Sequence, residues 1–196
     1  MRPLRPALGG TRPDGADLAA MTVADRPWSA WTWSRRTGEG LSAVVELAVL
    51  VGLQASGKST FYEQCLKDHH TLVSKDLFPR SARHKQARQM RLVEEALAAG
   101  RSVAVDNTNP SPEEWRPLVA AARARGATVT AYWFRPDLME SLRRNAARTD
   151  RARVPEVGVH ATLRRLRRPA RADGFDAVYE VRFDGRGGFE VRPEGG

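Results

Sequence analysis

The feature that most constrains the fold is an apolar segment followed at once by a glycine-rich loop. Residues 44–51 read VVELAVLV, a nearly continuous apolar run that is typical of a strand buried on both faces of a parallel sheet. Residues 52–59 read GLQASGKS and fit the pattern G-x-x-x-x-G-K-S/T. A helix is expected from Lys58 to about Lys67. Because this order of strand, loop and helix is the context that the pattern requires, the sequence predicts a P-loop.

Strand-like and helix-like segments alternate along the rest of the chain. Further strands are expected at 71–74, 101–105, 128–134 and 177–183, and residues 189–191 are a candidate to pair near the last of these. Helices are expected at 81–99, 111–126 and 137–149. Such alternation implies right-handed crossovers and a parallel sheet. We therefore predict an α/β fold of the P-loop NTPase type, with three layers (α/β/α), a mainly parallel sheet of about five strands and a helical lid.

The first 40 residues differ in composition from the rest. They are rich in Pro, Gly and Arg and lack apolar periodicity. Residues 1–40 are therefore expected to form a disordered extension, and residues 41–196 the P-loop domain. Trp28, Trp31 and Trp33 interrupt the pattern of the extension. Three explanations are open: these tryptophans dock on the domain, they bind a partner, or translation starts at Met21 or a later codon.

The net charge and the cysteine content limit the expected partners and the expected cellular setting. The formal net charge is +9, from 32 Lys and Arg against 23 Asp and Glu. This favours a polyanionic partner, but an Arg-rich composition without functional meaning explains it nearly as well. Cys65 is the only cysteine, so no intrachain disulfide is expected and a cytoplasmic setting is predicted. Since no apolar run approaches about 20 residues, no membrane partner is expected.

The residue types of the loop match the chemistry of a nucleoside triphosphate. The glycines let the backbone turn tightly and approach phosphate groups, and the backbone N–H groups then face the anion. Lys58 would reach the β- and γ-phosphates of ATP, and Ser59 would ligate Mg²⁺. ATP and Mg²⁺ are therefore the predicted cofactors. The predicted ATP-binding residues are Gly52, Gln54, Ala55, Ser56, Gly57, Lys58, Ser59, Thr60 and the more distant Arg144.

Two acidic residues follow predicted strands, where the ligand crevice of an open α/β sheet lies. Asp76 comes directly after the second strand, and it is either a proton acceptor for a substrate hydroxyl or a helix cap. Asp106 ends the third strand, where P-loop proteins often hold Mg²⁺ or its water. The residues after it, Asn107-Thr108-Asn109, could alternatively serve only to shape the loop.

A pair of arginines marks the predicted lid. Arg144 and Arg148 are four residues apart and therefore share one face of a helix. A basic helix near the nucleotide could close over the triphosphate and balance its developing charge. The alternative is a solvated basic face, which is common in so Arg-rich a chain.

Taken together, these motifs resemble polynucleotide 5′-hydroxyl kinase domains, which occur in phage and animal end-repair enzymes. The resemblance covers about residues 45–183, and small bacterial P-loop kinases of the AAA type are also similar. The residues that carry it occur in the same order and approximate spacing: Gly-Leu-Gln-Ala-Ser-Gly-Lys-Ser-Thr-Phe (52–61), Ser-Lys-Asp (74–76), Val-Asp-Asn-Thr-Asn-Pro (105–110), Arg-Asn-Ala-Ala-Arg (144–148), Arg-Val-Pro (153–155) and Asp-Gly-Phe-Asp (173–176).

The resemblance implies a role for each matched residue. Asp76 would be the general base that activates the 5′-hydroxyl, and Asp106 would organise the acceptor side. Arg148 would contact the ATP phosphates and the transition state. The family has an arginine three positions after the base, where this chain has Pro79. The candidates for substrate binding are Asp106, Asn109, Arg80 and Arg83.

The sequence thus predicts an ATP-dependent phosphotransferase that acts on a 5′-hydroxyl of DNA or RNA. No phosphatase signature of the Asp-x-Asp type is present, so a stand-alone kinase domain is expected. One alternative is a small-molecule or nucleoside kinase on the same scaffold. Another is an ATP-gated binding module without significant turnover, although a candidate base at Asp76 argues against it because a pure switch has no need of one.

Overall fold

The computed structural model describes residues 44–79, 81–149 and 153–194. All of them belong to the second of two compact units, Glu39–Gly196. The extension predicted for residues 1–40, with its three tryptophans, lies outside the described residues, and so does Arg80. Among the residues described, no helix combines the length and the apolar character needed to cross a membrane.

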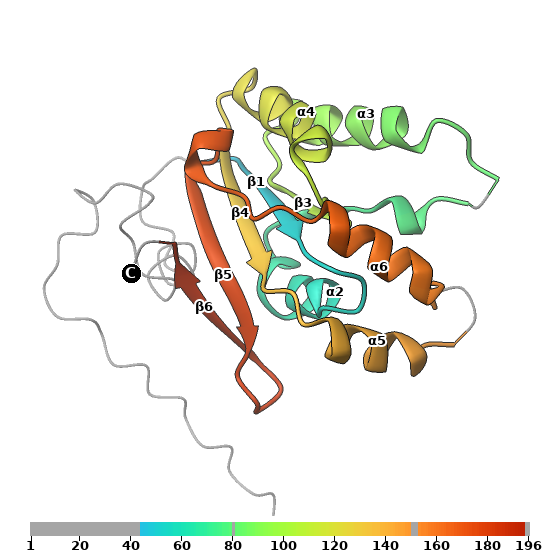
Figure 1. Cartoon of the computed structure of the whole chain (residues 1–196). Coiled ribbons are helices and arrows are strands. Elements are labelled where there is room, and N and C mark those ends of the chain that lie inside the picture. Colours follow the sequence, from blue (N-terminus) through green and yellow to red (C-terminus); the bar gives the residue numbers. More distant parts are fainter. Residues whose placement is uncertain (1–43, 80, 150–152, 195–196) are drawn as a thin grey trace, which may run out of the picture. The chain divides into compact units, whose positions relative to one another are not determined.

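A single mixed sheet carries the fold, in the order β2-β3-β1-β4-β5-β6 (Figure 1). The first five strands pair in parallel, and the sixth is antiparallel to β5. The strand before the P-loop is central, because Val49 pairs with Val105 on one side and Ala131 on the other. The strands are β1 (Glu46–Val51), β2 (Thr71–Val73), β3 (Val103–Asp106), β4 (Thr128–Phe134), β5 (Ala177–Phe183) and β6 (Phe189–Pro193).

Helices cover both faces of this sheet, while two further helices lie together at one end of it (Figure 1). The α-helices are α2 (Lys58–Phe61), α3 (Lys85–Ala98), α4 (Pro112–Arg123), α5 (Leu138–Ala146) and α6 (Glu156–Arg165). Three shorter helical turns accompany them: the π-helical turn Tyr62–Leu66 and the 3₁₀ turns Lys75–Leu77 and Arg171–Asp173.

The alternation of side chains along each strand explains the three layers. On β4, Val129, Ala131 and Trp133 belong to the main apolar core, which also contains the inward-facing residues of α3 and α4. The residues between them face the other side, where the ring of Tyr132 lies 5.1 Å from that of Phe61 in α2. The predicted α/β/α architecture with a mainly parallel sheet is therefore confirmed.

The structure differs from the sequence-based prediction at three places. The segment 189–193 forms a full sixth strand instead of leaving a five-stranded sheet. The helix expected from residue 81 begins only at Lys85, after His84 in the left-handed region with φ 54°. Helix α6 was not predicted, because only Val159 of its side chains is buried and its apolar pattern is accordingly weak. Together α5 and α6 form the predicted helical lid.

Removing residues 1–40 should leave the domain stable, because this segment lacks apolar periodicity and residues 45–178 already form an extensive apolar core among the described residues. We expect a melting temperature within about 2 °C of that of the full chain and an unchanged affinity for a non-hydrolysable ATP analogue. Thermal unfolding of both chains provides the measurement. A much lower melting temperature for the shortened chain would show instead that the tryptophan-containing segment packs on the domain.

Candidate active site

The P-loop joins β1 to α2 through two positions that need special backbone conformations. Ala55 has φ 58° and Gly57 has φ 98°. Gly57 also has the ring of Phe183 against the position where a Cβ would stand. At Gly52, a Cβ would lie 2.8 Å from the Cβ of Phe134. A side chain is therefore excluded at Gly52 by lack of space, and at Gly57 by the backbone conformation as well.

The loop is tied to the segment that follows β3. The backbone N–H of Gly52 donates to the carbonyl of Thr108 over 3.0 Å. The side-chain amide of Asn109 donates to the carbonyls of Leu50 (2.8 Å) and Val105 (3.4 Å). Because Asn109 is only 2% exposed and its amide binds two strands, its geometry favours a structural role over the predicted contact with substrate.

Lys58 lies at the centre of the loop. Its ammonium donates to the carbonyls of Gly52 (3.1 Å) and Leu53 and to the hydroxyl of Ser56 (3.2 Å). Burial lowers the pKa of Lys58 to about 8; the carboxylates of Asp106 and Asp76 raise it, and the charge of Arg148 lowers it further. Lys58 therefore interacts electrostatically with each of the other three predicted reaction-centre groups, Asp76, Asp106 and Arg148.

Ser59 and Asp106 form a close pair beside Lys58. The Ser59 hydroxyl donates to Oδ2 of Asp106 over 2.6 Å. Burial raises the pKa of Asp106, and the hydrogen bond from Ser59 and the charge of Lys58 oppose this rise. A hydroxyl and a carboxylate are hard oxygen donors of the kind that Mg²⁺ takes alongside water and phosphate oxygens. The pair therefore fits Mg²⁺, although no group of three or more His, Cys, Asp or Glu side chains in the described residues could hold a metal alone.

Asp76 lies in the 3₁₀ turn that follows β2, and its side chain is exposed. The cap of this turn is Ser74, whose hydroxyl accepts from the backbone N–H of Asp76 over 3.3 Å. Within the described parts of the chain, the Asp76 carboxylate itself has no hydrogen-bond or ion-pair partner. The capping function that the sequence left open thus belongs to Ser74, and the Asp76 carboxylate remains available for chemistry.

A buried amide pair positions this turn. The side-chain carbonyl of Asn107 accepts from the backbone N–H of Lys75 over 3.0 Å, and its NH₂ group donates to the side chain of Gln89 over 2.7 Å. Gln89 is only 1% exposed. The sequence analysis missed this role of Gln89, because a glutamine on a helix carries no pattern that separates it from a solvated one.

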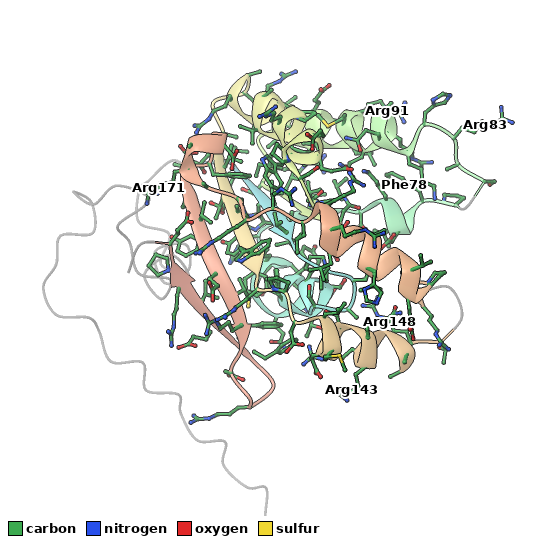
Figure 2. All side chains as sticks on the ribbon, in the orientation of Figure 1. Phe78, Arg83, Arg91, Arg143, Arg148 and Arg171 are labelled. Carbon is green, nitrogen blue, oxygen red and sulfur yellow. The ribbon has the colours of Figure 1, made fainter. Side chains whose placement is uncertain are left out.

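The lid contributes Arg148, just beyond the end of α5 (Figure 2). The side-chain amide of Asn145 exchanges two hydrogen bonds with the backbone of Val154, of 2.6 and 3.0 Å. These bonds close the segment between the two lid helices, which includes Arg148. The influence of Arg148 on the pKa values of Lys58 and Asp106 places its charge near the P-loop.

Arg144 has a different environment. Its guanidinium pairs with Glu140 over 2.5 Å and lies 3.8 Å from the ring centroid of Phe183. Since Phe183 in turn contacts Gly57, the lid and the end of β5 meet at the P-loop. A second tie between lid and loop is the hydrogen bond of 2.8 Å from Gln54 to Thr162 of α6. Neither Phe183 nor Thr162 was identified from the sequence, and a contact of Arg144 with ATP stays a prediction.

Of the two predicted acceptor arginines, the structure describes only Arg83, and it does not lie at this site. Arg83 is exposed and lies at the outer end of the segment before α3, away from α2 and the P-loop (Figure 2). The nearest cation–aromatic pair on this side is Arg88, whose guanidinium lies 4.8 Å from the ring centroid of Phe78. Acceptor binding by Arg83 therefore has no support from the geometry.

Comparison with known proteins places this site in a family. The profile described as an AAA domain matches residues 47–171, which is more than half of the chain. The chain therefore belongs to this AAA domain family, and its fold is that of a P-loop kinase.

Individual similar proteins differ in what their names describe. The bifunctional polynucleotide phosphatase/kinase of Schizosaccharomyces pombe is 27% identical over 142 residues, which are 70% of this chain and 34% of that protein. A chain of the Pnkp1/Rnl/Hen1 RNA repair complex has a TM-score of 0.54 at 22% identity, over 65% of this chain and 46% of that one. A sugar kinase from Janibacter sp. HTCC2649 has a TM-score of 0.50 at 14% identity, over 69% and 85%. The chain thus spans about a third of the first protein and less than half of the second, and the two structural likenesses show the fold alone.

The pKa of Lys58 predicts how ATP binding depends on pH. Lys58 is charged below its pKa of about 8, and the charged form attracts the triphosphate. The affinity should therefore be highest near pH 7 and fall as the pH rises through 8, by up to about tenfold per pH unit. The measurement is the dissociation constant of a non-hydrolysable ATP analogue between pH 7 and 9.5, with Mg²⁺ in excess so that the triphosphate stays fully ionised. Lys58→Arg should give a flat profile, and an equally flat wild-type profile would contradict the assignment.

Proposed function

We propose that the chain transfers the γ-phosphoryl group of ATP to a hydroxyl, namely the 5′-hydroxyl of a DNA or RNA strand. The observation that carries the proposal is the electrostatic coupling of two buried groups to two others. Lys58, at the start of α2, and Asp106, at the end of β3, are coupled to each other and each also to Asp76 and Arg148. The four groups supply a base, two cations and an oxygen ligand for Mg²⁺ at one place, as in-line phosphoryl transfer requires.

Each residue has a defined part in the transfer. The Asp76 carboxylate accepts the proton of the acceptor hydroxyl while that oxygen forms its bond to the γ-phosphorus. The bond between the γ-phosphorus and the bridging oxygen breaks, and ADP leaves with the electron pair. Lys58 and Arg148 balance the negative charge on the transferring group and the leaving oxygen. Ser59 and Asp106 would hold Mg²⁺, which neutralises charge between the β- and γ-phosphates.

Several features support a nucleic-acid end as the acceptor. The most similar curated protein reported above is named a polynucleotide phosphatase/kinase, and a structural relative belongs to an RNA repair complex. The net charge of +9 favours a polyanion. Beside Asp76 stand Leu77, which is 67% exposed, and the Phe78–Arg88 pair. An apolar surface with an aromatic ring and a cation suits a base and its phosphate.

A small-molecule kinase is the second candidate, because the sugar kinase likeness covers most of that chain. The two candidates share the P-loop and the base and differ in what binds next to Asp76. An ATP-gated binding module is disfavoured by the carboxylate of Asp76. This group is exposed beside Lys58 and has no structural partner among the described residues.

Replacing the proposed base should separate binding from chemistry. Asp76→Asn keeps the shape of the side chain but removes the proton acceptor. We expect ATP affinity within a few-fold of wild type and transfer slower by about 10²-fold or more. Lys58→Ala provides the comparison, since it should impair both ATP binding and transfer. If Asp76→Asn loses ATP binding in proportion to activity, Asp76 is structural and the proposed mechanism is wrong.

The acceptor can be identified by salt dependence. A single strand that contacts protein cations through its phosphates releases counterions, so log affinity should fall with log salt by about 0.7 per phosphate contacted. We expect this steep response for a short 5′-hydroxyl oligonucleotide at fixed ATP and Mg²⁺, measured through its apparent affinity in the transfer reaction. The matched control is a free nucleoside. Equal use of the nucleoside, or a flat salt response of the oligonucleotide, would rule out a strand end and leave the small-molecule alternative.

A further inference from the structure

A cavity of about 470 Å³ opens where the N-terminus of α4 meets the C-terminal end of α6. Trp115, in the first turns of α4, forms part of its wall, and no P-loop residue lines it. The charged residues that line it are Arg164, Arg165, Arg167 and Arg168 from the end of α6 and the segment after it, together with Glu113 and Asp173. Cations therefore outnumber acids around this space by four to two.

Direct bonds fix the walls of the cavity relative to each other. The backbone N–H of Arg167 donates to the carbonyl of Pro110 over 2.7 Å. The guanidinium of Arg165 pairs with Glu114 over 3.3 Å, and the same carboxylate pairs with Lys75 over 3.4 Å. Glu114 thus joins Arg165 at the cavity to Lys75, and Lys75 directly precedes the proposed base Asp76.

One wall presents a donor that lacks an acceptor. Trp115 is fully buried, and its indole N–H has no hydrogen-bond partner within the described residues. Its ring is held against Phe175, with the centroids 6.1 Å apart. A buried donor without an acceptor is costly and rare in folded proteins. An acceptor atom of a ligand would satisfy it only by entering this wall, because the indole nitrogen is itself buried.

The field in the cavity favours an anion. Arg164 and Arg167 have no carboxylate partner in the part of the chain that the structure describes, whereas Arg165 and Arg168 pair with Glu114 and with Glu180 and Glu194. Helix α4, which is twelve residues long, has its N-terminus at the cavity, so the positive end of its dipole also favours an anion there.

The acids around the cavity agree with this field. The pKa of Glu113 lies below its ordinary value, first because of the Ser111 hydroxyl and then because of its own backbone N–H. The first turn of α4 therefore already stabilises one negative charge. The Asp173 carboxylate is engaged elsewhere, since it accepts from the backbone N–H of Ala170 over 2.9 Å.

We propose that this cavity is a second phosphate-binding site, separate from the P-loop, which takes the phosphate group of a nucleic-acid strand or of a small phosphorylated molecule. Planar guanidinium groups and an indole N–H match the acceptor oxygens of a phosphate. The volume admits a phosphate together with a small organic part. Helix α6 also carries Thr162, which bonds to Gln54, so one helix touches both anion sites.

The test uses the full chain with its P-loop saturated by a non-hydrolysable ATP analogue and Mg²⁺. Inorganic phosphate and a short 5′-hydroxyl oligonucleotide are then titrated separately, and binding is followed by calorimetry. Arg164→Gln with Arg167→Gln should weaken binding by about tenfold, since each loses a charged donor. Arg125→Gln is the matched control, because it removes an exposed arginine near the other end of α4 and should change nothing.

Two further variants separate ligand binding from structure. Trp115→Phe removes the indole N–H and should weaken binding by a few-fold while ATP-analogue affinity and the melting curve confirm folding. Glu113→Gln removes the competing carboxylate and should strengthen binding by a few-fold, which no purely structural role would produce.

The two probes identify the source of the phosphate. A loss seen with the oligonucleotide alone assigns the site to a strand phosphate, and a loss seen with inorganic phosphate assigns it to a free phosphorylated molecule. If the double arginine variant binds both probes as tightly as wild type does, the proposal is overturned. Since the readout is binding and not turnover, this result is independent of whether the chain proves to be a kinase.

Discussion

The reaction centre depends on the side-chain amide of Asn109. This one group donates to the carbonyl of Leu50 at the end of β1 and to that of Val105 near the end of β3. Those strands carry the P-loop and Asp106, so the amide holds the two sides of the proposed ATP site together where the pairing between β1 and β3 ends. A second hydrogen bond joins the segments that follow the two strands, since the N–H of Gly52 donates to the carbonyl of Thr108. The hydrogen bond between Ser59 and Asp106 is possible because both backbones are held in this way.

Burial determines the electrostatics of the same centre. Lys58 and Asp106 are both nearly enclosed, and burial shifts both pKa values toward the neutral forms. Each group opposes the shift of the other, because their charges attract. The charged form of each group is therefore stabilised by interactions with neighbouring groups: Asp106 favours the charged form of Lys58, and Lys58 and the Ser59 hydroxyl favour that of Asp106. Such a pair responds strongly to a triphosphate, which adds negative charge where water is largely excluded.

Much of the fold could be predicted because the relevant patterns are local. Continuous apolar runs such as residues 46–51 marked the buried parallel strands, and Gly52 to Ser59 marked the loop between strand and helix. The lid was less predictable, because α6 buries only Val159 and its apolar period is too weak to detect. The acids after the strands could be placed, since strand ends meet at one edge of a parallel sheet. The residues that support the rest of the site could not be placed, because Gln89, Thr162 and Phe183 acquire their roles only through contacts between segments distant in sequence.

Asp76 lies at the edge of the sheet, and the P-loop lies at its centre. The ATP side is built into the centre of the sheet, where each strand is paired on both sides. Asp76 instead sits on a short turn after β2, a three-residue strand at the edge, and the amide of Asn107 and the Lys75–Glu114 ion pair hold that turn. A substitution or insertion after Asp76 can therefore reshape the surface next to the base without disturbing the nucleotide site. Under the proposed function, sequence drift in this segment would change which hydroxyl is accepted while the phosphate donor stayed the same.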